Sequence, residues 1–191
     1  MMIRDRWYGI FLAGLLLFVS GCGSSRYFML TEPPATTHQR YSHKLPVVGV
    51  EKISLPEYMK QGKVARQISS TQIDYLDNDN WLEDMEESLT KQLIVTIQKS
   101  FDTPSVYAYP WGLSKQATIK VQVRINKFIA QGAYVYLDAN YEITHMKSGR
   151  KYSQLFSTKV ATKEDTQSIV SSMNIAFSRL SKSIMGGLNR F

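Results

Sequence analysis

Cysteine is almost absent from this sequence: Cys22 is the only one in 191 residues. A disulfide needs two cysteines, so no bridge within the chain can stabilise the fold. A secreted domain without disulfides must be stable through a well-packed hydrophobic core. The 11 tyrosines, 8 phenylalanines and 3 tryptophans supply apolar surface for such a core and exclude a disordered stalk.

Histidine is also scarce, with only His38, His43 and His145. The sequence contains no His-Glu-x-x-His pattern, no paired metal-ligand spacing and no glycine-rich phosphate loop. Ser88-Leu89-Thr90-Lys91 is a Ser-x-x-Lys match, but its charged helical context favours a solvated face over a catalytic pair. The acidic residues within 83–87 fit a helix N-terminus better than a metal site. We therefore expect a binding or structural protein, not an enzyme, without a metal or a cofactor beyond a covalent lipid.

No cluster of lysine and arginine interleaved with aromatic residues is present, so nucleic acid is not an expected partner. The formal net charge is +7, from 23 basic and 16 acidic residues. Removal of a leader containing Arg4, Asp5 and Arg6 takes away a net +1 and leaves +6. That charge suits an anionic membrane surface or an acidic protein partner equally well, and it is also compatible with no particular partner.

The N-terminal apolar run, Trp7–Val19, is too short to span a bilayer as a helix. It holds about 13 residues, whereas a spanning helix needs about 20. Arginines precede it and Val19-Ser20-Gly21-Cys22 ends it, an order typical of a secretory signal segment. With the only cysteine at the cleavage position, the segment resembles the lipobox of bacterial lipoproteins, whose cysteine is acylated and becomes the new N-terminus. The alternative is an ordinary signal peptide with a chance cysteine.

These features divide the chain into a signal peptide (1–21), a lipidated tether (22–45) and one domain (46–191). Gly23 after the cysteine, in place of aspartate, resembles lipoproteins that a host with two membranes sorts to its outer membrane. Within the tether, the apolar stretch Arg26–Leu30 would be a liability if exposed. We therefore expect it to lie on the domain as a first edge segment.

Hydrophobic alternation predicts an antiparallel meander of three long strands in the second half of the chain. Residues 117–125 and 133–143 alternate between apolar and polar, and a third strand is expected over 152–160. A break in phase at Phe128 predicts a bulge near Asn126-Lys127. Further strands are expected at 47–55, 64–68, 72–76 and 105–109.

Two segments have the apolar repeat of amphipathic helices. The first extends from Leu82 to Phe101, and the spacing of Asn80 and Glu83 suggests a capping box before it. The second extends to Leu188, with Thr162 as its expected cap. Two such helices and about six strands predict an α+β fold: a two-layer domain with a mostly antiparallel sheet and both helices on its apolar face.

Two groups of residues are candidates for a partner interface. Tyr134 and Tyr136 lie on the polar face of the meander, and tyrosine is enriched at interface hot spots. The alternative is an ordinary solvated sheet face with cross-strand tyrosine packing. Pro56 and Tyr58 belong to a loop after the first long strand, which either contacts a partner or folds over the core as a plug.

Five segments carry a family resemblance through their order and spacing. They are Val48-Gly49-Val50, Ile53 to Met59, Trp81 with Met85-Glu86, Tyr109-Pro110-Trp111, and Leu137 to Tyr141. Together they resemble the ABC-type transport auxiliary lipoproteins of the PqiC type. The similarity covers most of residues 22–191.

The resemblance implies an outer-membrane lipoprotein that faces the periplasm and works with an MCE-domain protein and inner-membrane transporter proteins. Together such proteins move lipids across the periplasm and keep the envelope intact. The lipoprotein would dock the end of the MCE assembly at the outer membrane, and a ring-forming homo-oligomer is one arrangement for that role. The alternative is a structural or assembly lipoprotein of outer-membrane or cell-wall machinery.

Overall fold

A computed structural model describes residues 24–31, 40–42, 44–110 and 116–191. The predicted signal peptide and Cys22 lie outside these ranges. So do most of residues 32–45, including His38 and His43, and Trp111, which belongs to one of the segments that carry the family resemblance. The strands are β1 (Arg26–Phe28), β2 (Val48–Glu51), β3 (Lys63–Gln67), β4 (Ile73–Trp81), β5 (Val106–Tyr109), β6 (Ile119–Gln131), β7 (Tyr134–His145) and β8 (Lys151–Ala161). The helices are the 3-10 helix η1 (Glu57–Met59), α2 (Met85–Phe101) and α3 (Thr166–Leu188).

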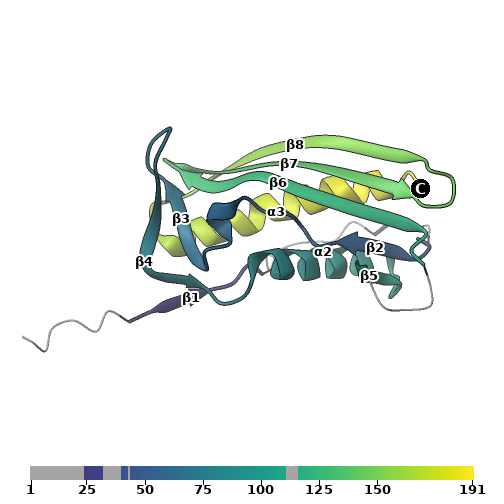
Figure 1. Cartoon of the computed structure of the whole chain (residues 1–191), viewed down its shortest axis with the longest axis horizontal. Helices are drawn as coiled ribbons and strands as arrows, with labels where there is room; N and C mark the ends of the chain where they lie inside the picture. Colours follow the sequence, from purple (N-terminus) through teal and green to yellow (C-terminus); the bar gives the residue numbers. More distant parts are fainter. Residues whose placement is uncertain (1–23, 32–39, 43, 111–115) are drawn as a thin grey trace, which may run out of the picture.

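The eight strands form one mixed sheet built around β6. One edge of β6 pairs antiparallel with β7 along its length, and β7 pairs antiparallel with β8. The other edge of β6 is shared, since β2 pairs in parallel with its first residues and β3 with its last. β5 continues the sheet beyond β2, whereas β4 and β1 continue it beyond β3, so two branches lie at opposite ends of β6 (Figure 1).

The predicted α+β fold is confirmed, with both long helices on one side of the sheet (Figure 1). α3 packs on β7 and β8, α2 packs on β5 and β2, and the two helices touch each other. The longest pairings are antiparallel, as expected, but β1, β2, β3 and β5 make parallel pairs that local alternation does not reveal. Among the described residues, no helix is long and apolar enough to cross a membrane.

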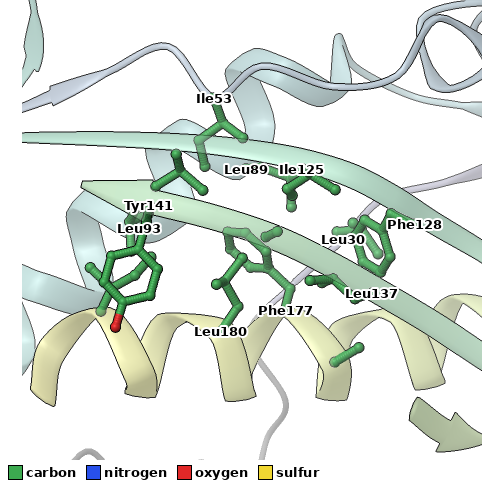
Figure 2. Close-up of a cluster of buried hydrophobic side chains, with 14 of the residues drawn as sticks. Leu30, Ile53, Leu89, Leu93, Ile125, Phe128, Leu137, Tyr141, Phe177 and Leu180 are labelled. Atoms are coloured by element: carbon green, nitrogen blue, oxygen red, sulfur yellow. The ribbon is translucent and has the colours of Figure 1, made fainter. Parts of the chain in front are cut away.

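The alternation of the meander was predicted correctly. The apolar positions of β6 and β7 face the helices and form a core with α2 and α3, part of which Figure 2 shows. The register of β6 against β7 shifts between Ile125 and Lys127, which is the predicted bulge. Gly132 and Gly149 turn the two hairpins with positive φ angles of 55° and 70°, which glycine adopts without strain.

The predicted starts of both helices were wrong by a few residues. Asp84, not Asn80, caps α2, and Asp165, not Thr162, caps α3. Each aspartate accepts a hydrogen bond from the backbone amide three residues later, at 2.8 Å. Asn80 cannot start a helix because β4 continues through Trp81, five residues beyond the predicted end of that strand.

The N-terminal segment Arg26–Leu30 lies on the domain, as expected. β1 pairs in parallel with β4, and Leu30 is part of the hydrophobic core (Figure 2). The Arg26 guanidinium donates to both carboxylate oxygens of Asp79, at 2.6 and 2.8 Å, and the Thr166 hydroxyl donates to one of them. The buried Asp79 therefore joins β1, β4 and the first residue of α3.

Two adjacent glycines near the end of α3 provide a test of the packing between helix and sheet. A Cβ at Gly187 would lie 2.7 Å from the Ile143 side chain and 2.9 Å from the Tyr152 ring, whereas one at Gly186 would meet nothing within 4 Å. We expect Gly186→Ala to raise the free energy of unfolding by up to about 1 kcal/mol. Gly187→Ala should lower it by about 1 kcal/mol, because overpacking outweighs the gain in helix propensity. Urea unfolding of the two variants measures both; equal effects would contradict the close approach.

Candidate functional site

Tyr134 and Tyr136 lie at the start of β7, on the face of the sheet that turns away from the helices. The residues between and after them, Val135 and Leu137, are buried in the core, so strand alternation directs the two tyrosines outward. Their ring centroids are 6.2 Å apart in an edge-on arrangement. We call this surface, with the lysines described next, the tyrosine face.

A lysine lies over each ring of the tyrosine face. The Lys127 ammonium on β6 is 4.7 Å from the ring centroid of Tyr136, and that of Lys159 on β8 is 4.8 Å from Tyr134. Such cation–π contacts contribute about 0.5–1 kcal/mol each at exposed sites. The result is an aromatic, positively charged surface across three strands, suited to acidic or aromatic groups of a partner.

Tyr58 contacts β6, one of the strands of the tyrosine face, but has a different role. Its hydroxyl accepts a hydrogen bond of 2.8 Å from the backbone amide of Phe128, just after the bulge in β6. Burial raises the pKa of Tyr58, so the phenol stays protonated at neutral pH. Ile129, the next residue of β6, pairs with Tyr136, so Tyr58 is hydrogen-bonded to β6 one residue away from the partner of Tyr136.

The segment around Pro56 fills the gap between the two branches of the sheet. Ser54 forms a β-bridge with Arg124 in the middle of β6. Further along β6, the Tyr58 hydroxyl accepts the hydrogen bond of the Phe128 amide. Leu55 and Met59 are buried, while Pro56 is half-buried. The geometry therefore favours the plug over the alternative of an exposed partner contact.

The acidic residues at the start of α2 are only partly a solvated face. Glu86 accepts a hydrogen bond from the Leu55 amide at 3.3 Å, and its carboxylate lies 3.3 Å from Lys52 and 3.4 Å from Lys60. The hydrogen bond to Glu86, with the charge of Asp84, raises the pKa of Lys52. Glu86 thus holds the plug against α2. Within the described residues, no group of three His, Cys, Asp or Glu side chains is placed to hold a metal ion.

A shallow polar depression of about 270 Å³ lies beside the plug, and no sequence pattern indicates it. It is lined by residues of β2, β6 and β7 together with Lys52 and Ser54. Its acids are already paired: Glu51 accepts from Gln122 at 2.7 Å, and Lys151 lowers the pKa of Glu142 by hydrogen bonding to it. These internal partners make the depression a weaker ligand site than the tyrosine face.

The fold and the site define a class: a single α+β sheet-and-helix domain whose outward sheet face carries tyrosines and lysines. The chain belongs to the family described as the ABC-type transport auxiliary lipoprotein component, which it matches over residues 28–185. The predicted family resemblance is therefore confirmed, and with it the general themes of a lipoprotein and of transport.

Two solved structures share the fold. A crystal structure of an uncharacterized protein has a TM-score of 0.67 and 16% identity, covering 85% of this chain and 97% of that chain. A protein from Xanthomonas campestris has a TM-score of 0.66 and 14% identity, covering 86% and 95% respectively. At these identities the similarity establishes the fold alone. Comparison with curated proteins finds no match.

Proposed function

We propose that this chain is the outer-membrane lipoprotein of an MCE/ABC-type intermembrane lipid-transport system. It docks the periplasm-spanning MCE protein at the outer membrane and so supports envelope integrity. The observation that carries the proposal is the match of residues 28–185 to the auxiliary lipoprotein family of ABC-type transport. The lipobox ending at Cys22 supports an acyl anchor, and Gly23 supports sorting to the outer membrane.

In this role the domain acts by binding and not by catalysis. The tyrosine face is the surface that we assign to the partner, because it presents aromatic rings and lysines without using them to build the core. The proposed direct partner is an MCE-domain protein, which works with the inner-membrane transporter proteins of the same system. A homo-oligomeric ring around the end of the MCE protein is compatible with this role.

A structural or assembly lipoprotein of outer-membrane or cell-wall machinery is the second candidate. It would carry the same anchor and the same fold, so only the partner separates the two. Affinity purification of the full chain from solubilised membranes tests this directly. Recovery of an MCE-domain protein with its permease supports transport, whereas recovery of outer-membrane assembly or wall proteins alone supports the second candidate.

Replacing Tyr134 or Tyr136 with aspartate should weaken capture of the MCE protein without unfolding the domain. Hot-spot residues contribute about 2 kcal/mol or more, so each variant should bind roughly thirtyfold more weakly. Pull-down of the MCE protein measures the loss, and thermal unfolding checks the fold. Val95→Asp, which places the same charge on an exposed position of α2, is the matched control. If both tyrosine variants capture the MCE protein as well as the parent does, the tyrosine face is an ordinary solvated surface and not the binding site.

A further inference from the structure

Three large apolar side chains are exposed together at one end of the molecule. Tyr27 is 64% exposed, Met29 is 45% exposed and Leu82 is 56% exposed. We call them the β1 patch. Tyr27 belongs to β1, Met29 follows it directly, and Leu82 follows the end of β4.

Strand geometry places the three side chains on one side of the sheet. Tyr27 and Met29 are two residues apart, so they point the same way, while Leu30 enters the core. Phe28 pairs with Trp81 in the parallel register, and the Leu82 amide donates to the Phe28 carbonyl at 2.8 Å. Continuing this register by one residue sets Leu82 beside Met29. The fold does not need the patch, because the neighbouring side chains already bury the inner side of β1.

The β1 patch is close in sequence to the residue that carries the lipid. Four residue steps separate Cys22 from Arg26, which reach at most about 14 Å when fully extended. Arg26 is itself fixed to Asp79, and β1 is paired with β4. The end of the sheet that carries the patch therefore cannot move far from a membrane that holds Cys22.

We propose that the β1 patch lies in the headgroup region of the membrane that carries the lipid anchor. The inference rests on the proposed acylation of Cys22. Tyrosine suits this region because its ring is apolar and its hydroxyl is polar. Lys63, exposed on β3 opposite Asn80, adds a positive charge for anionic headgroups, and Glu83 is the acid next to the patch.

This contact would fix the orientation of the whole domain. The β3-β4-β1 branch lies at the opposite end of β6 from the β2-β5 branch (Figure 1). With the β1 patch on the membrane, the β3-β4-β1 branch is the part of the sheet nearest to the bilayer. Two contacts, the acyl chains and the β1 patch, then fix the orientation of the domain relative to the bilayer.

Two single-thiol variants of the acylated full chain test the proposal. Acylation blocks the Cys22 sulfur, so Leu82→Cys leaves one free thiol for an environment-sensitive nitrobenzoxadiazole label. Leu155→Cys is the matched control, because Leu155 is 83% exposed on β8, at the other edge of the sheet. Both chains are reconstituted into vesicles of phosphatidylethanolamine and phosphatidylglycerol, with and without brominated acyl chains. We expect several-fold brighter, blue-shifted emission at position 82, quenched by brominated lipid, and water-like emission at position 155.

Each outcome separates the possible failures. A chain that does not float with the vesicles lacks the anchor, which overturns the proposed function and this inference with it. A chain that floats but gives the same water-like emission at both positions overturns the patch contact alone. Bright emission at position 82 without quenching by brominated lipid means that protein covers the patch, such as a second copy of the chain, and also overturns it.

Discussion

Replacing Cys22 with alanine is expected to release the protein almost completely from the membrane fraction while its domain stays folded. An acyl chain contributes about 0.8 kcal/mol per buried methylene group, and stable anchoring needs more than one such chain or signal. Without acylation only weak contacts, such as the one proposed for the β1 patch, remain. Fractionation of cells into membrane and soluble material measures the release, and circular dichroism of the soluble protein checks the fold.

The design of this variant must avoid a second anchor. An uncleaved Trp7–Val19 segment could itself stay in the membrane, so the alanine variant is made behind a leader that an ordinary signal peptidase removes. Ser24→Ala behind the natural leader is the control and should remain in the membrane fraction. An alanine variant that still fractionates fully with membranes would contradict the assignment of Cys22 as the anchor.

The parts of the fold that local sequence determines were predicted well. β6 and β7 are long and buried on one face, so their side chains alternate with period two, and even the bulge near Asn126 disturbs that phase visibly. The core positions of α2 and α3 repeat every three or four residues for the same reason. A single strand or helix carries such patterns, so no knowledge of its neighbours is needed.

The parts that depend on distant neighbours were not predictable. Asp79 lies in the polar run Asp77–Asn80, and its partner Arg26 on β1 is 53 residues away. The parallel pairings follow from crossovers that no local pattern records. Tyr58 was named as a candidate, but its hydrogen bond to Phe128 spans 70 residues, so its role in closing the sheet emerges only from the fold.

The buried carboxylate of Asp79 leads to the largest expected effect on stability. Its side chain is 2% exposed, whereas that of Arg26 is 62% exposed. Among the described residues, removing Arg26 leaves the buried negative charge with only the Thr166 hydroxyl as a side-chain donor. Because breaking a buried pair costs about 3–5 kcal/mol and one partner is accessible to water, we expect Arg26→Ala to lower the free energy of unfolding by about 3 kcal/mol.

Urea unfolding of the chain without its anchor measures this loss. Asp74→Ala is the control: it removes the exposed Arg66–Asp74 pair, 3.8 Å long, and should cost less than about 1 kcal/mol. Adding Asp79→Asn to Arg26→Ala should restore part of the stability, since the buried charge is then gone. If Arg26→Ala costs no more than the control, β1 is not held by this pair.

The same pair determines how close the domain stays to the proposed anchor at Cys22. When Arg26 is replaced, β1 loses its bidentate contact and pairs with β4 only through three residues of backbone. We then expect chymotrypsin to cleave after Tyr27 or Phe28 faster than in the parent, releasing the domain from vesicles. Asp74→Ala should be released at the parent rate. If Arg26→Ala and the parent are cleaved at equal rates, strand pairing alone protects β1 from the protease. The ion pair would then help to position α3, through the hydrogen bond from Thr166 to Asp79.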